Sequence, residues 1–183
     1  MLQTPIRNES GIRVLFDAQQ IAARVQEMGL AIARDLGPKT HEPIFVGVLK
    51  GACLFLSDLA RATPLDVEID FATLSSYGRG TTSSGNVRLE SDLRNDIAGR
   101  HVLVCEGVVD SGRSLAFLME LLRKRKPASV SIAALLDKVP CRKVEVAVDY
   151  AGWTIADEFV VGYGMDYGER YRCLPYVGVL ENP

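Results

Sequence analysis

A short polar turn after an apolar segment is the first place where this sequence could carry out chemistry. Residues 102–105 are apolar, Glu106 follows them, and Asp110-Ser111-Gly112-Arg113-Ser114 comes directly before a helix-like segment. A helix N-terminus presents free backbone N–H groups, and small residues let an anion approach them closely. The hydroxyls of Ser111 and Ser114 would add two more donors. The turn is therefore typical of an anion site, although an ordinary helix N-cap would use the same residue types.

Two other kinds of site are not supported by the sequence. It contains neither a GxxxxGK[ST] phosphate loop nor a GxGxxG pattern after a strand. Its four cysteines are scattered without a CxxC pair, and His41 and His101 stand apart from them. This pattern indicates reduced thiols and argues against a disulfide framework or a zinc site.

Composition and charge narrow the class of protein. A chain of 183 residues with 48% hydrophobic and 24% charged residues is typical of one globular domain. The net charge of −2 comes without a basic stripe, so we expect no nucleic-acid partner. No apolar stretch reaches the ~20 residues that span a bilayer, and the N-terminal MLQTPIRNES lacks the apolar core of a signal peptide. We therefore expect a cytoplasmic protein with no membrane partner.

Helical and extended patterns alternate along the chain. Apolar residues at helical spacing predict a helix over residues 16–36, with Asp17 as its N-cap, and a short apolar run follows at residues 44–49. Residues 75–86 are rich in Gly, Ser and Thr and predict a loop, and residues 88–98 are polar and irregular. Further helices are predicted over residues 52–61 and 111–125, and further strands over residues 65–74, 102–105, 129–136, 159–163 and 176–180.

This alternation predicts an α/β fold with a mainly parallel twisted sheet flanked by helices. No internal repeat or linker divides the chain, so we expect a single domain over residues 1–183. In such sheets ligands bind at the carboxyl ends of the strands. That rule directs attention to Lys50, Ser76-Tyr77, residues 106–114, Lys138 and Asp166.

Together, these strand ends resemble the type I phosphoribosyltransferase family, and within it the hypoxanthine-guanine branch. The strand, the acid, two β-branched residues and Asp-Ser-Gly are similar to the family's phosphoribosyl pyrophosphate signature. The resemblance covers roughly residues 10–181. The other matching segments are Leu49-Lys50-Gly51, Ser76-Tyr77, Lys138 after LLD, residues 159–163, Met165-Asp166-Tyr167 and Arg172.

The resemblance implies how a phosphoribosyl donor would be held. Glu106 would accept hydrogen bonds from the ribose hydroxyls. Lys50, Gly51 and Arg172 would face the pyrophosphate, whose negative charge grows as the glycosidic centre becomes cation-like. Asp166, together with Glu106, would hold Mg²⁺ that also binds pyrophosphate oxygens and waters. The ribose 5-phosphate would lie on the backbone amides and hydroxyls of Asp110, Ser111, Gly112, Arg113 and Ser114.

The resemblance also implies a purine pocket in a small base-binding hood over residues 157–181. Phe159 would stack on the base, and the Val160 backbone would meet its Watson–Crick edge. Lys138 would donate to a 6-oxo group, so an oxopurine would be preferred to adenine, whose amino group would meet a donor with a donor. Asp110 would lie near the purine N7, where it could take the ring proton or only stabilise positive charge.

Three further expectations follow from the same resemblance. Ser76-Tyr77 would open a lid over residues 75–86 that is mobile and excludes water when closed. The Leu49–Lys50 peptide would be strained or cis, because the family turns the backbone there to aim amides at pyrophosphate. The protein would assemble as a homodimer or homotetramer.

The sequence departs from the family at Gly107. The family carries two adjacent acids there, whereas here Glu106 is followed by glycine. If the missing carboxylate weakens binding of phosphoribosyl pyrophosphate, Gly107→Asp should lower the KM for that substrate. Alternatively, a water fills the gap, the chain has become a poor enzyme kept for binding, or glycine simply eases a tight strand end.

The predicted activity is purine salvage. Hypoxanthine or guanine would react with phosphoribosyl pyrophosphate to give inosine or guanosine monophosphate (IMP or GMP) and pyrophosphate, with Mg²⁺ as cofactor. Another base such as xanthine, or a non-catalytic nucleotide-sensing or RNA-binding regulator on the same fold, stays open as an alternative. A receiver or dinucleotide-binding domain is disfavoured because the glycine fingerprint is missing.

Overall fold

Six strands form the main sheet of the computed structural model, which describes residues 11–37, 43–76 and 87–181. Their order is β4-β3-β2-β5-β6-β7, and neighbouring strands are parallel except for the antiparallel pair β3 and β4. The prediction of an α/β fold with a mainly parallel sheet is confirmed. The strands are β2 (Ile44–Leu49), β3 (Glu68–Ser76), β4 (Val87–Ser91), β5 (His101–Val109), β6 (Ser129–Asp137) and β7 (Tyr150–Thr154).

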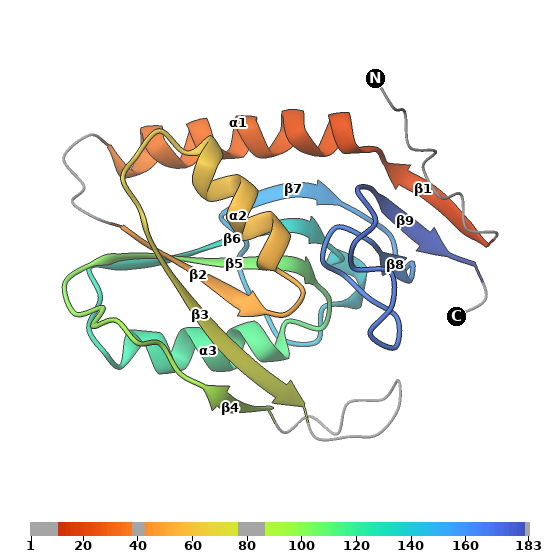
Figure 1. Cartoon of the computed structure of the whole chain (residues 1–183). Helices are drawn as coiled ribbons and strands as arrows, with labels where there is room; N and C mark the ends of the chain where they lie inside the picture. The colour runs from red at the N-terminus through yellow and green to blue at the C-terminus, as the bar shows by residue number, and fades with distance from the viewer. Residues whose placement is uncertain (1–10, 38–42, 77–86, 182–183) are drawn as a thin grey trace.

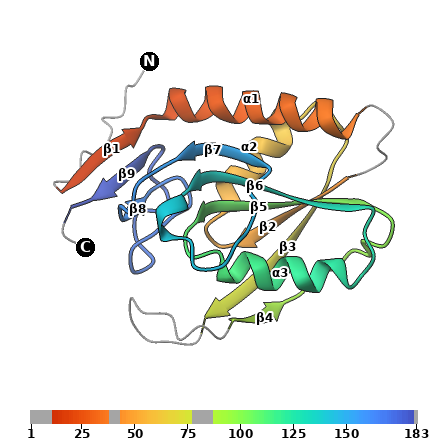
Figure 2. The same cartoon turned by 180° about the vertical axis from the view of Figure 1, so that it is seen from behind.

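Helices cover both faces of this sheet, as Figure 1 and the reverse view in Figure 2 show. Successive residues of a strand point to opposite faces. Phe45 therefore joins the core beneath α1 and α2, whereas Ile44 and Val46 join the core beneath α3. Burial on both faces explains why the central strands could be found in the sequence as continuous apolar runs. The helices are α1 (Ala18–Leu36), α2 (Cys53–Ala62) and α3 (Arg113–Arg123).

Local sequence fixes the start of α1. The Asp17 side chain accepts hydrogen bonds from the backbone N–H groups of Gln19 and Gln20, at 2.9 and 2.8 Å. The Gln20 side chain in turn accepts from the Asp17 N–H at 2.9 Å, which completes a capping box. The predicted N-cap is confirmed.

A second, smaller sheet lies at the carboxyl ends of the main strands (Figure 1). Its three strands are antiparallel in the order β1-β9-β8. We call this sheet, together with the segment between β8 and β9, the hood. Its strands are β1 (Ile12–Phe16), β8 (Val160–Val161) and β9 (Val177–Leu180).

Several elements differ from the prediction. β1, β4 and β7 were not expected, because each is a short strand at a sheet edge and lacks a continuous apolar run. β5 continues past Glu106 to Val109, since its far end still pairs with β6. Ser75 and Ser76, predicted as loop, are the end of β3, and the predicted strand over residues 159–163 is reduced to β8. None of the described helices is long and apolar enough to cross a membrane.

Candidate active site

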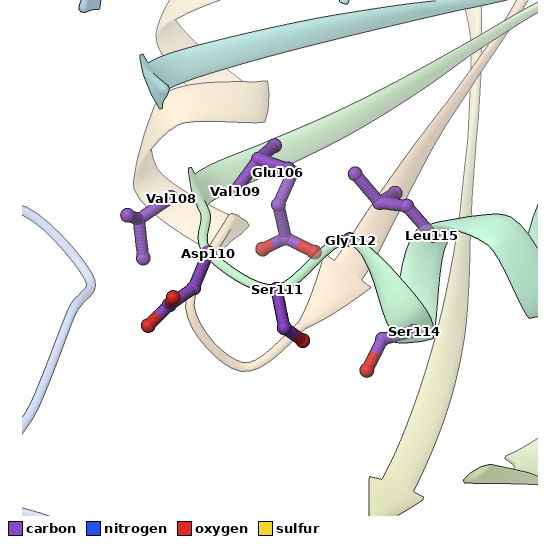
Figure 3. A pocket seen from close by; sticks show the side chains of 8 residues that line it. All are labelled: Glu106, Val108, Val109, Asp110, Ser111, Gly112, Ser114 and Leu115. Carbon is purple, nitrogen blue, oxygen red and sulfur yellow. The ribbon is translucent and has the colours of Figure 1, made fainter. Parts of the chain in front are cut away.

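The turn after β5 lines a pocket of about 150 Å³ (Figure 3). α3 starts after Gly112, which adopts a left-handed backbone (φ +80°) and has no side chain with which to cap the helix. The Ser111 hydroxyl lies 3.5 Å from the Arg113 N–H, at the outer limit of a hydrogen bond. The first turn of α3 therefore keeps donors to offer an anion, which favours the anion site over the ordinary cap. The pocket is lined by Glu106, Val108, Val109, Asp110, Ser111, Gly112, Ser114 and Leu115.

A neighbouring segment clamps this turn from outside. The Ser111 carbonyl accepts hydrogen bonds from the N–H groups of Lys143 and Val144, at 3.0 and 3.1 Å. The Arg142 guanidinium donates to the Asp110 carbonyl at 2.7 Å and pairs with the Asp137 carboxylate. Side chains of this pair are only 15% and 11% exposed, respectively. Sequence reasoning missed Arg142 and Asp137, because no local pattern marks a long-range clamp.

Close packing explains the glycine in the turn. A Cβ atom at Gly112 would lie 2.6 Å from the Val144 carbonyl oxygen, and the positive φ there disfavours any other residue. The glycine of the Asp-Ser-Gly sequence is therefore explained by the packing of the neighbouring segment against the turn.

Lys138 and Asp110 come together at the ends of β6 and β5. The Lys138 backbone N–H donates to the Val109 carbonyl at 2.9 Å, and its Nζ lies 3.7 Å from an Asp110 carboxylate oxygen. The Lys138 side chain is buried, whereas that of Asp110 is 58% exposed. A buried ammonium beside an accessible carboxylate can present a donor and an acceptor to one ligand.

Glu106 points its carboxylate into the pocket beside Ser111 and Gly112 (Figure 3). Burial raises the pKa of Glu106 to about 8, although the Gly107 N–H, which donates to the carboxylate at 3.0 Å, acts in the opposite direction. A group with this pKa releases its proton easily when a cation or a set of hydroxyl donors arrives.

Two glycines surround the Gly51 carbonyl. A Cβ at Gly107 would lie 3.0 Å from that oxygen, and a Cβ at Gly164 would lie 2.4 Å from it. Three segments thus approach each other without side chains: the loop after β2, the far half of β5, and the hood. Among the alternatives for Gly107, the geometry favours the tight strand end, since a carboxylate there would also face the Gly51 oxygen.

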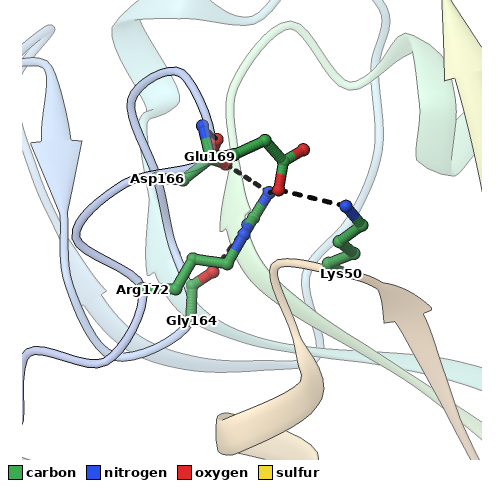
Figure 4. Close-up of polar contacts among 5 residues, drawn as sticks. All are labelled: Lys50, Gly164, Asp166, Glu169 and Arg172. Atoms are coloured by element: carbon green, nitrogen blue, oxygen red, sulfur yellow. Dashed lines mark hydrogen bonds and ion pairs between the residues drawn. The ribbon is translucent and has the colours of Figure 1, made fainter.

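Figure 4 shows a polar cluster formed by residues of the hood and by Lys50 from the loop after β2. The Arg172 guanidinium donates to the Gly164 carbonyl at 2.8 Å and pairs with Asp166 at 2.8 Å and with Glu169 at 3.3 Å. Lys50 Nζ lies 3.0 Å from the same Glu169 oxygen. Arg172 Nε is buried and has no hydrogen-bond partner among the described residues. Two cations and one acid of the predicted site therefore lie together, with Glu169, which sequence reasoning did not single out.

Of the predicted base-pocket residues, Val160 lies in the hood, Phe159 directly precedes it, and Lys138 lies at the end of β6. Phe159 is 37% exposed and meets the Tyr167 ring edge-on, with centroids 5.5 Å apart. Val160 is buried and pairs with Val179 in the hood sheet. The Tyr163 hydroxyl donates to Asp58 of α2 at 2.6 Å, and this hydrogen bond connects the hood to a helix that packs on the main sheet.

The predicted Leu49–Lys50 peptide can be checked in the structure, whereas most of the proposed lid cannot. The Leu49–Lys50 peptide is cis, as predicted. Ser76 ends β3 and pairs with Val87 of β4, but Tyr77 and the rest of the proposed lid, residues 77–86, lie outside the described residues.

Comparison with known proteins adds independent evidence. The model of the phosphoribosyl transferase domain family matches residues 13–168. A bifunctional protein TilS/HprT of Listeria monocytogenes is 44% identical over 169 residues, which are 92% of this chain but 26% of that protein. The chain thus spans about a quarter of the length of the relatives of this kind.

Other similar proteins match over nearly their whole length. The hypoxanthine-guanine phosphoribosyltransferase of Bacillus subtilis is 43% identical over 169 residues, covering 92% of this chain and 93% of that protein. A solved structure of a hypoxanthine phosphoribosyltransferase from Trypanosoma cruzi, in complex with the product IMP, superposes with a TM-score of 0.89. It is 37% identical and covers 96% of this chain and 98% of that one.

Proposed function

Because this chain belongs to the phosphoribosyl transferase domain family, we propose that it transfers the phosphoribosyl group from phosphoribosyl pyrophosphate to hypoxanthine or guanine. The products are IMP or GMP and pyrophosphate, and the role is purine salvage. One observation supports the choice of base more than any other: the buried Lys138 ammonium lies 3.7 Å from Asp110, beside the phosphate turn. A buried ammonium can donate a hydrogen bond to a 6-oxo oxygen, whereas a 6-amino group would place a donor against a donor.

In this proposal each end of the donor substrate has its own cradle. The 5-phosphate lies on the N–H groups of the turn from Asp110 to Ser114, and Glu106 accepts hydrogen bonds from ribose hydroxyls. Lys50 and Arg172 bind the pyrophosphate and stabilise its growing charge. Gly51 has no side chain and contributes backbone only, and its carbonyl oxygen faces Gly107 and Gly164.

The chemical step exchanges one bond at the ribose C1′ for another. The bond from C1′ to the pyrophosphate oxygen breaks, its electron pair leaves with pyrophosphate, and a purine ring nitrogen bonds to C1′. The five-membered ring of the purine then loses the proton from its second nitrogen. Asp110, half-exposed beside Lys138, either accepts that proton or stabilises the positive charge until solvent takes it. Phe159 stacks on the base from the hood side, with the Val160 backbone at its edge.

The residues present fit a magnesium ion carried mainly by the substrate. No cluster of three metal-ligating side chains occurs in the described part of the chain. Asp166 offers a single carboxylate, whose oxygens contact Arg172 at 2.8 Å and the Glu169 N–H at 2.9 Å. Mg²⁺ commonly binds one or two carboxylates plus phosphates and waters. We assign Asp166, with Glu106 on the ribose side, as its protein ligands; when bound, the ion neutralises charge on the leaving pyrophosphate.

The proposal also includes a cytoplasmic location. All four cysteines are free, as expected in a reducing compartment. Assembly as a homodimer or homotetramer stays a prediction that rests on the resemblance alone.

A spectrophotometric assay tests the function. Purified protein is mixed with phosphoribosyl pyrophosphate and Mg²⁺, and hypoxanthine, guanine, xanthine and adenine are offered in turn. We expect turnover of hypoxanthine or guanine only when both the donor and Mg²⁺ are present, and none with adenine. Turnover of xanthine alone would change the assigned base, and no turnover of any purine would favour the nucleotide-sensing regulator.

A variant tests the role of the lysine. Lys138→Gln replaces an obligate donor by an amide that can also accept, so we expect the preference for oxopurines over adenine to fall. Lys124→Gln on the exposed face of α3 serves as the control. An unchanged preference in the Lys138 variant would mean that another group recognises the 6-position.

A further inference from the structure

Glu169 is presented by a tight turn in the hood. Tyr167 and Arg170 pair in antiparallel fashion through two backbone hydrogen bonds of 3.2 and 3.1 Å. The two residues between them, Gly168 and Glu169, have φ values of +56° and +65°. Two consecutive positive φ values are the mark of a type I′ turn. The Asp166 carboxylate accepts the Glu169 N–H at 2.9 Å and holds the turn in place.

This turn places one carboxylate oxygen of Glu169 between two cations (Figure 4). That oxygen lies 3.0 Å from Lys50 Nζ and 3.3 Å from the Arg172 guanidinium. The Glu169 carboxylate is thus held by two cations, and it joins the loop after β2 to the hood.

We propose that Glu169 is an internal substitute for pyrophosphate and sets how tightly this site holds a diphosphate. The inference rests on the proposed function, in which Lys50 and Arg172 bind the diphosphate group. A diphosphate that binds Lys50 and Arg172 competes with Glu169 for their hydrogen bonds, and the negative charge of Glu169 repels it. Glu169 thus weakens diphosphate binding and promotes departure of the product.

The exposure of the three side chains indicates which cation changes partner when a diphosphate binds. The side chains of Lys50 and Glu169 are each 65% exposed, so their ion pair is screened by water and separates at little cost. Arg172 is only 22% exposed and is also held by the Gly164 carbonyl and by Asp166. Arg172 therefore stays in position, while Lys50 changes partner from the Glu169 carboxylate to the diphosphate.

Direct titration with inorganic pyrophosphate and Mg²⁺ tests this inference. Glu169→Gln keeps the backbone N–H that contacts Asp166 but removes the charge, so we expect pyrophosphate to bind about three- to tenfold more tightly. Product inhibition by pyrophosphate should strengthen by a similar factor. Glu169→Asp keeps the charge on a shorter side chain and should give a smaller gain.

The chain offers a closely matched control. Glu120 pairs with Lys124 on α3 at 2.7 Å, with side chains 69% and 66% exposed, and lies outside the candidate site. Glu120→Gln should leave the Kd for pyrophosphate unchanged. Damage to the fold would weaken binding in the Glu169 variant, so a tighter Kd cannot come from a merely structural role.

Unchanged or weaker pyrophosphate binding by Glu169→Gln would overturn the inference. The titration needs no turnover, so the two proposals can fail separately. A wild-type protein without activity on any purine would refute the proposed function. An active wild-type protein whose Glu169→Gln variant binds pyrophosphate no more tightly would refute only the role of Glu169.

Discussion

The two ends of the candidate site are held by different kinds of interaction. At the phosphate end, backbone hydrogen bonds to Ser111 and the largely buried pair of Arg142 and Asp137 fix the turn. At the pyrophosphate end, Lys50 and Glu169 form an ion pair whose side chains are 65% exposed. Breaking a buried pair is strongly destabilising, whereas an exposed pair contributes little.

This difference matches what each end has to do in the proposed reaction. The 5-phosphate is present on both the donor substrate and the nucleotide product, so its cradle never has to release one group to receive another during transfer. The pyrophosphate must leave, and contacts that exchange easily serve that purpose. In the proposed reaction, a firmly held turn would bind the group that stays, and easily exchanged contacts would bind the group that leaves.

The largest effect is expected at the rigid end. Arg142→Ala leaves the Asp137 carboxylate buried without its partner, so we expect a loss of about 3 kcal/mol in the free energy of unfolding, with weaker binding of IMP. Urea unfolding and nucleotide titration measure the two effects. Arg34→Ala, which removes an arginine that is 76% exposed, should change neither. An Arg142 variant of normal stability would mean that the turn is held mainly by the backbone bonds.

The next effect is a pH dependence of stability that comes from the raised pKa of Glu106. The pKa of Glu106 is raised from 4.5 to about 8 in the folded protein, so its protonated form stabilises the fold. That stabilisation is complete below the unfolded value and is lost as pH rises through the folded value. Glu106→Gln removes the effect, so the variant should gain stability relative to wild type by up to about 1.4 kcal/mol for each pH unit between about pH 5 and about pH 8.

Urea unfolding of both proteins across this pH range, without metal or nucleotide, measures the difference. A constant difference would show that Glu106 titrates normally and is well solvated. Glu90→Gln, at an exposed acid on β4, is a suitable control.

A smaller effect is expected at Gly107, where the two ends of the site meet. Either Gly107→Ala or Gly107→Asp would place a Cβ 3.0 Å from the Gly51 carbonyl. We expect both variants to raise the KM for phosphoribosyl pyrophosphate by about two- to tenfold, corresponding to roughly 1 kcal/mol. Steady-state kinetics of the two variants distinguishes steric crowding at Gly107 from the loss of a carboxylate there. If Asp lowers KM while Ala raises it, a missing carboxylate is what limits binding.

The smallest effect on stability is expected at the exchangeable end. Lys50→Ala should leave the midpoint of urea unfolding unchanged, because its ion pair is exposed, yet it should weaken binding of pyrophosphate. Lys124→Ala, from the matched exposed pair on α3, should change neither quantity. A marked loss of stability in the Lys50 variant would contradict the contrast between the two ends.

The comparison also shows which parts of the site could be predicted. Lys50, Asp110 and Lys138 could be singled out because parallel strands bring their carboxyl ends to one edge, so that polar residues after apolar runs gather there. Asp166 lies in the antiparallel hood, so this rule does not account for its position. Arg142, Asp137 and Glu169 were missed. Arg142 and Glu169 lie outside strand ends, where charged residues are usually solvated. Asp137 ends β6, but its partner Arg142 is not marked by any local pattern.

The sequence by itself determined the features that depend on near neighbours. The capping box at Asp17, the doubly buried strand over Ile44–Leu49 and the polar turn at Ser111 each follow from residues a few positions apart. Pattern and local hydrogen bonding suffice for such features. Such patterns, repeated along the chain, predicted the α/β fold, and the order of the polar strand ends carried the family resemblance.

Only the tertiary structure decided which distant groups meet. It brought Arg142 against the Asp110 carbonyl, 32 positions away, and Glu169 against Lys50, 119 positions away. It also showed that Gly107 faces the Gly51 carbonyl, which gives its missing side chain a steric cause. Such contacts depend on how the hood and the loops pack onto the sheet, and packing of this kind joins residues that share no local pattern.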